Sequence, residues 1–191
     1  MVRSGKGQVA RWLRRLASDR RAVSAVEFAL VLPVMVTIYL GGNEVGNELT
    51  ISREVGHVAS TVGDLVAQCK QISNSDMTNI LTAASSVVAP YSTTLLKIKV
   101  SGITVSSSNV ATVTWSDEFQ DTALTVNSVV TLPTALQTAS SFVVMAEVHY
   151  AYTPYIGYVL TGTFDLTTKI YFAPRNSTTI SRTTSTSCSS S

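Results

Sequence analysis

Apolar residues dominate the first long element of the chain, and a single charge interrupts them. The stretch from Ala22 to Leu40 would span about 28 Å as a helix, close to the hydrocarbon thickness of a bilayer. After Gly42 the pattern stays helical but becomes amphipathic, with steps of three and four between Val45, Leu49, Ser52, Val55, Ala59, Val62 and Val66. We predict one helix from about Val23 to Gln68, half in a membrane and half outside it.

A second, shorter helix is predicted from Asp76 to Val88. Ser75 is a suitable N-cap, Asp76 suits the positive end of the helix dipole, and Pro90 follows the helix end. One face of this helix would be apolar, through Met77, Ile80, Leu81, Ala84 and Val88.

Beyond Pro90 the apolar residues recur every second position, which predicts strands. The predicted strands are Leu96–Val100, closed by Gly102, then Asn109–Trp115, Phe142–Tyr152 and Thr163–Phe172. The polar run from Ser116 is a predicted connection, residues 125–137 are ambiguous, and the Ser/Thr-rich tail after Pro174 would be loose unless tied down. Helices first and strands later indicate an α+β fold, with a small antiparallel sheet packed on the long helix.

Charge is distributed very unevenly along the chain. Seven of the fourteen Lys and Arg residues precede Ala22, where Asp19 is the only acid. Bases that flank a membrane span remain in the cytoplasm, so the remainder of the chain would be exported. Because no aromatic-rich surface accompanies these bases, we expect no nucleic-acid partner. The predicted organisation is a basic cytoplasmic leader (1–22), a transmembrane helix (23–42), a periplasmic α+β domain (43–175) and a tail (176–191).

Two residues within the apolar run are unusual for a membrane span. Glu27 is costly in hydrocarbon, so it is either functional or reaches the nearby cytoplasmic interface. Pro33 removes one helix hydrogen bond, to the carbonyl of Ala29, and permits a kink, which is either tolerated or used as a hinge.

Cys69 and Cys188 both follow the predicted span. In an oxidising periplasm two exported thiols usually pair, and this bond would tether the tail to the end of the long helix. Two unpaired thiols, or a bond between molecules, remain open alternatives.

Side chains in recognisable catalytic or metal-binding patterns are not found in the sequence. His57 and His149 have no metal-ligand spacing, and Asp117, Glu118 and Asp121 are typical of a solvated loop. No nucleophile elbow, phosphate loop, zinc pattern or dinucleotide fingerprint occurs. We therefore expect neither an enzyme nor a bound metal or cofactor.

The run from Ala22 to Pro33, AVSAVEFALVLP, resembles the start of the TadE/TadF-like minor pilins (pseudopilins) of tight-adherence pilus systems. Glu44-Val45-Gly46, the strand ending Tyr150–Pro154, and Ala173-Pro174-Arg175 are also similar to that family. The resemblance implies cleavage between Ala22 and Val23 by a prepilin peptidase, a membrane aspartic protease. It also implies an assembly role for Glu27 and Phe28 near the new terminus.

The implied protein is a minor pilin of the bacterial inner membrane, with one span and a periplasmic C-terminus, later incorporated into the pilus. Its partners would be the peptidase, other major and minor pilins, and the inner-membrane assembly platform. Major Tad-type pilins are typically short and nearly all helical, so the sheet domain favours initiation or capping. Two alternatives stay open: an uncleaved TadG-like scaffold, and an exported adhesin that binds through Tyr150, Tyr152, Tyr155 and Tyr158.

Overall fold

The computed structural model of the chain describes residues 20–154, 157, 161–184 and 188, with side chains from residue 23 onward. By the packing of its backbone the chain divides into two units. One comprises Met1–Gly46 with Tyr155–Thr161, and the other comprises Asn47–Pro154 with Gly162–Ser191. The first predicted leader residues, 1–19, lie outside the described residues.

The long helix, α2, runs from Arg20 to Ala67 and contains Pro33. Its part in the second unit packs one apolar stripe into the core, formed by Ile51, Val55, Val58, Ala59, Val62 and Val66. These side chains are at most 2% exposed, as steps of three and four place them on a single face. The predicted long helix is thus present. Val55, Ala59, Val62 and Val66 of its predicted face are buried, whereas Val45 and Leu49 are 43% and 54% exposed and Ile51 and Val58 are buried instead.

The second helix, α3, runs from Asn74 to Ser85 and continues as a 3₁₀ turn, Ser86–Val88. The predicted N-cap was wrong by two residues. Ser73 caps the helix, because its hydroxyl accepts a hydrogen bond from the Asp76 amide while the Asp76 carboxylate accepts one from the Ser73 amide. Hydrogen bonds from the side chain and backbone of Ser73 lower the pKa of Asp76.

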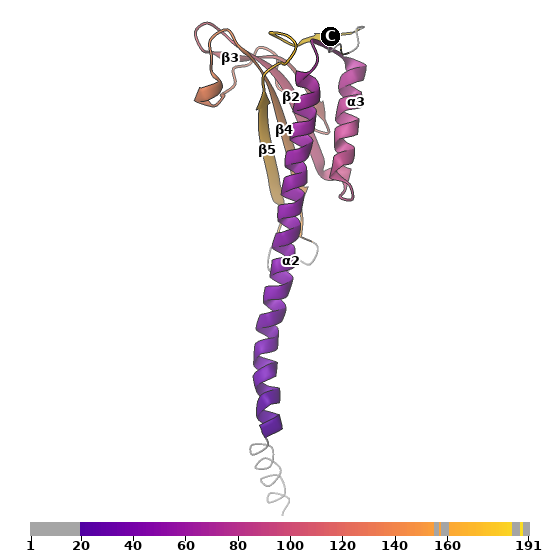
Figure 1. The fold of residues 1–191 in the computed structure, drawn as a ribbon, viewed down its shortest axis with the longest axis vertical. Helices are drawn as coiled ribbons and strands as arrows, with labels where there is room; N and C mark the ends of the chain where they lie inside the picture. The colour runs from indigo at the N-terminus through magenta and orange to yellow at the C-terminus, as the bar shows by residue number, and fades with distance from the viewer. Residues whose placement is uncertain (1–19, 155–156, 158–160, 185–187, 189–191) are drawn as a thin grey trace, which may run out of the picture. The chain divides into compact units, whose positions relative to one another are not determined.

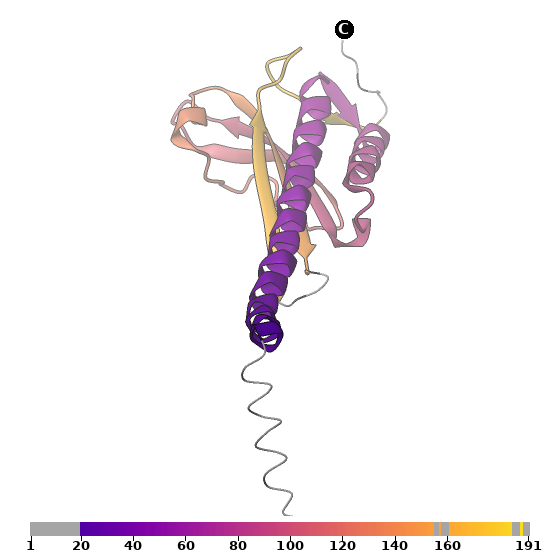
Figure 2. The ribbon, with the colours of Figure 1, turned by 60° about the horizontal axis from the view of Figure 1, so that its bottom comes forward.

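The main sheet has the order β3-β2-β4-β5, and all of its pairs are antiparallel. Its strands are β2 (Leu96–Val105), β3 (Ala111–Phe119), β4 (Phe142–Tyr152) and β5 (Phe164–Phe172). Within this unit, α3 and the second half of α2 cover the same face of the sheet (Figure 1 and Figure 2). The α+β fold with an antiparallel sheet packed on the long helix is confirmed.

Two strands are longer than the sequence predicts. β2 continues through Gly102, where a Cβ would lie 2.4 Å from the Trp115 ring and 2.7 Å from the Phe142 ring. Here glycine serves close packing of two rings rather than the end of a strand. β3 continues to Phe119, because Asp117 on its inner side is paired with Arg182 and Phe119 packs on the core.

The opposite face of the sheet is half covered and half open. Between β3 and β4 the chain forms a loop with a 3₁₀ turn, Thr134–Leu136, and a bridge from Val129 to Thr112. Leu124, Val130 and Leu132 from this loop pack on Ile103, Val105, Val143 and Met145. The ambiguous residues 125–137 are thus a loop that covers the apolar half of this face.

The tail after β5 is tied down along its described part. Residues 181–183 form a short strand, β6, which pairs in parallel with β1 (Gln71–Ser73). Ile180 is 1% exposed, and its carbonyl accepts a hydrogen bond from the Trp115 indole at 2.7 Å. The tail was expected to be loose unless other contacts held it. The strand pairing and the contacts of Ile180 hold its described residues in place.

Candidate functional site

The first half of α2 exposes a long apolar surface. Among the described residues, no side chain of its most apolar 18-residue window is buried. Phe28, Leu30, Ile38 and Tyr39 each leave more than 60% of their surface exposed. A water-soluble domain rarely presents so large an apolar area unless it meets a membrane or a partner. By length and composition this helix could cross a membrane, and it is the one such helix in the described part of the chain.

Glu27 lies on this apolar surface, and its side chain is exposed. Val23 and Glu27 are four residues apart in one helix, so their side chains lie on the same face. Phe28 follows on the adjoining face and is 63% exposed. The structure therefore places all three residues on a surface that is open to a neighbouring helix.

The predicted cleavage site, Ala22 and Val23, lies in regular helical backbone near the start of the described part of α2. A protease acting there must first unwind this turn, because helical backbone does not fit an extended substrate cleft. Cleavage itself stays a prediction.

Pro33 is accommodated within α2. It has no amide hydrogen, so the carbonyl one turn earlier, at Ala29, loses its usual helix partner. One turn later, the Thr37 hydroxyl donates a hydrogen bond to the Pro33 carbonyl at 2.8 Å. The hydroxyl is thereby satisfied within its own helix.

A clamp of tail residues holds the C-terminal end of α2. The Arg175 amide donates to the Ala67 carbonyl at 2.9 Å, and the Asn176 side chain donates to the Gln68 carbonyl at 2.8 Å. Arg175 also pairs with Asp64. These donors satisfy carbonyls that a helix end leaves without partners.

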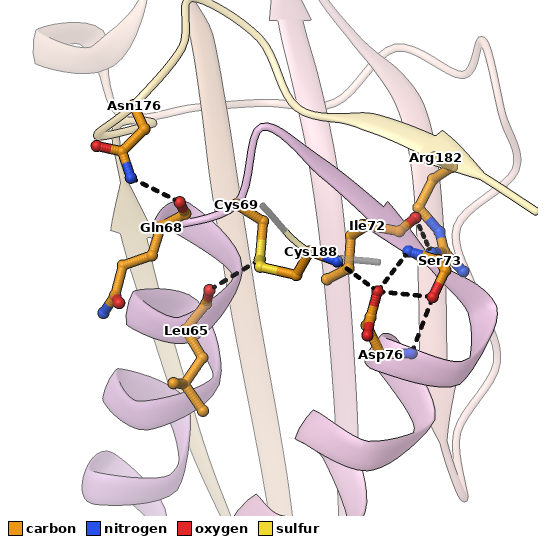
Figure 3. Close-up of a disulfide and its surroundings, with 9 residues drawn as sticks. All are labelled: Leu65, Gln68, Cys69, Ile72, Ser73, Asp76, Asn176, Arg182 and Cys188. Carbon is orange, nitrogen blue, oxygen red and sulfur yellow. Dashed lines mark hydrogen bonds between the residues drawn. A yellow bond between two sulfur atoms is a disulfide. The ribbon is translucent and has the colours of Figure 1, made fainter. Parts of the chain in front are cut away.

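Cys69 and Cys188 form a disulfide, with their Cα atoms 5.2 Å apart (Figure 3). The Cys188 amide donates a hydrogen bond to the Asp76 carboxylate at 2.8 Å, beside the N-cap of α3. Arg182 donates to the Ile72 carbonyl at 2.7 Å and to the Asn74 side chain at 2.8 Å. The tail thus joins the end of α2 to the start of α3.

A separate, polar site lies on the open half of the sheet, on the face opposite the packed half of α2. Charges alternate across the strands there, because Lys99 lies opposite Glu118 and Glu147, and Glu147 lies opposite Lys169. Lys169 Nζ is 2.8 Å from Glu147 Oε1, and His149 Nε2 is 3.0 Å from the same oxygen. Burial raises the pKa of Glu147, but these contacts and the charge of Lys99 outweigh it and lower the pKa.

The polar network borders a groove of about 490 Å³. Its lining consists of Leu95, Lys97, Lys99, Asp121, Glu147, His149, Ala151 and Asp165. Lys99 Nζ lies 3.3 Å from Asp121 Oδ2, and His149 Nδ1 lies 3.3 Å from Asp165 Oδ2. Within the described residues, no group of three His, Cys, Asp or Glu side chains is arranged to hold a metal ion.

Sequence reasoning missed this groove. The alternation of β4 placed Glu147 and His149 on one face, but strand register alone brings Lys99 and Lys169 beside them. Two of the tyrosines through which the adhesin alternative would bind, Tyr150 and Tyr152, are at most 7% exposed and lie in the core. Tyr155 and Tyr158 lie outside the described residues.

The geometry defines a protein with an exposed apolar N-terminal helix that continues into an α+β domain. Residues 22–62 match the family model described as TadE-like protein. This match spans the exposed half of α2 and most of its packed half, and it confirms the resemblance to TadE-like proteins. It indicates a protein associated with a Tad pilus and with pilus-related partners. No curated protein and no solved structure matches the chain significantly.

Proposed function

We propose that this protein is a minor pilin of a Tad-type adhesion pilus and takes part in initiating, capping or otherwise assembling it. One observation carries the proposal: the segment that matches TadE-like proteins begins with an exposed apolar stretch of helix, in which Glu27 is the single acid, before the helix packs into the domain. A structural role follows, in which the helix binds lipid before assembly and other pilin helices afterwards. We propose no catalytic activity.

Processing by a peptidase would convert the lipid-bound form of the helix into the form that packs with other pilin helices. The seven bases before Ala22 hold the N-terminus on the cytoplasmic side, within reach of a prepilin peptidase at the membrane. A cut between Ala22 and Val23 removes these bases and leaves an α-amine on Val23. Without its charged leader, the apolar helix can leave the bilayer and enter a bundle of similar helices.

Glu27 would set the position of this helix within the bundle. The Val23 amine of one subunit and the Glu27 carboxylate of its neighbour can pair, which offsets the cost of burying both charges. Such a pair has one favourable axial offset, so it fixes the register of adjacent helices. Gly42 and Gly46 support close packing, because no described atom lies within 4 Å of where their Cβ atoms would be.

The first test is the intact mass of the protein purified from its native membrane. The proposal predicts a chain that begins at Val23. A full-length chain, in cells whose pilus peptidase is active, would contradict it and favour the uncleaved scaffold.

The second test separates Glu27 from a general effect of charge on α2. Glu27→Gln should be cleaved normally but reduce the protein recovered in sheared pili. Glu48→Gln, a matched change further along α2, should leave that recovery unchanged. Equal recovery of the two variants would refute the pairing role of Glu27.

A further inference from the structure

We propose that the groove on the open face of the sheet binds a saccharide. The proposal goes beyond the pilin assignment and uses no residue of α2, so either can fail without the other. It rests on three properties of the groove: polar groups that are held in place, a balance of opposite charges, and an apolar wall.

The polar groups in the floor are held by neighbours and still have bonding capacity. Lys169 and His149 both contact Oε1 of Glu147, which leaves Oε2 as an acceptor. The side chain of Glu147 keeps 9% of its surface exposed. Lys99 has one ion pair, with Asp121, and therefore retains donors. Groups fixed in this way lose little conformational freedom when a ligand binds.

The charges around the groove select the class of ligand. Two lysines, Lys97 and Lys99, and three acids, Asp121, Glu147 and Asp165, line the groove. Lys169, which is not part of the lining, pairs with Glu147 and offsets the third acid, so the site has little net attraction for an anion or a cation. Donors and acceptors alternate instead, which suits a neutral molecule whose groups both donate and accept. Sugar hydroxyls have this property, and their hydrogen bonds to charged groups are stronger than those between neutral groups.

The remaining wall and the size of the groove fit the same ligand. Leu95 is 42% exposed and lies with Ala151 at the groove, where the C–H face of a sugar ring can pack. The volume of about 490 Å³ is within the usual range of small-molecule sites.

Cross-strand pairing accounts for only part of this arrangement. Glu147 with Lys169 is a cross-strand pair that stabilises the sheet. Lys97 lies opposite His149 rather than an acid, and the Asp165 side chain is 67% exposed. These two groups border the opening, where a ligand would meet them first.

The experiment uses the full chain in phospholipid nanodiscs. Saturation-transfer NMR with the methyl glycosides of glucose, galactose, mannose and N-acetylglucosamine is followed by a printed glycan array. We expect at least one glycoside or glycan to bind. Lys97→Ala and Asp165→Asn, both at the exposed rim, should each weaken that binding by about tenfold or more. Lys70→Ala, outside the groove, is the matched control and should bind normally.

Three results would overturn the proposal. The first is that no glycoside and no glycan on the array binds the protein. The second is binding that both rim variants retain at the level of the control, which would place the sugar elsewhere. The third is saturation transfer to a free amino acid such as glycine but to no sugar, which would assign the groove to a zwitterion.

Discussion

Two glycines of α2 should respond in opposite directions to the same substitution. A Cβ at Gly63 would lie 2.3 Å from Cε2 and 2.4 Å from Cδ2 of Phe172, and 3.4 Å from Cβ of Ala146. A Cβ at Gly56 would meet no described atom within 4 Å. Both positions are helical, so alanine brings the same gain in helix propensity, about 0.5–1 kcal/mol.

Gly63→Ala should nevertheless destabilise the domain. Carbon atoms pack at about 3.5–4.0 Å, so the Phe172 ring must move by more than about 1 Å. Such overpacking costs about 1–3 kcal/mol, which exceeds the gain in propensity. Gly56→Ala should therefore raise the free energy of unfolding while Gly63→Ala lowers it.

Urea denaturation of the full chain in detergent measures both effects by tryptophan fluorescence, in a Trp12→Phe background so that Trp115 alone reports. The double variant Gly63→Ala with Phe172→Leu should recover part of the loss, because leucine lacks the ring atoms that clash. A coupling energy near zero, or an equal gain from the two glycine substitutions, would refute the packing argument.

Three further predictions concern the tail and the polar network. Cys188→Ser should lower the free energy of unfolding by up to about 5 kcal/mol, the chain-entropy value for a separation of 119 residues, and reduction of the native protein should match it in urea titrations. Ile180→Ala should cost about 2–5 kcal/mol and alter Trp115 fluorescence before global unfolding; an unchanged midpoint would contradict its burial. Because the pKa of Glu147 is lowered in the fold, the stability it contributes is present above its ordinary pKa of 4.5 and is lost as the pH falls through the folded value. Glu147→Gln should therefore flatten the acid limb of a stability–pH curve, and an identical limb would count against the contact with Lys169.

The elements that sequence predicts well are those with a local cause. The period of α2 and the alternation of β4 follow from neighbours within a few residues, so their positions were evident before the structure. The capping box could also have been found in the sequence, because Ser73 lies three residues before Asp76. Ser75 was chosen instead because it directly precedes the first residue of the predicted helix.

What the sequence could not supply depends on contacts between distant residues. Gly102 is a strand end by local rules, and only the rings of Trp115 and Phe142 explain why the strand continues. The groove has the same origin, because Lys99 and Lys169 meet Glu147 through two strand registers. The position of the exposed apolar half of α2 could be predicted from the sequence, whereas whether it is cleaved and which partners it contacts depend on other molecules.

The clamp at the end of α2 makes the fold around Cys69 depend on residues that are made more than 100 positions later. Ribosomes make the N-terminus first, yet the groups that complete this region come from residues 176–188: the helix-capping Asn176, the strand partner β6 and the thiol of Cys188. A chain cut before residue 176 would contain the long helix and the strands of the main sheet, but Cys69 would have no partner thiol within the molecule. An unpaired Cys69 would therefore distinguish such a shortened chain from one that carries its tail.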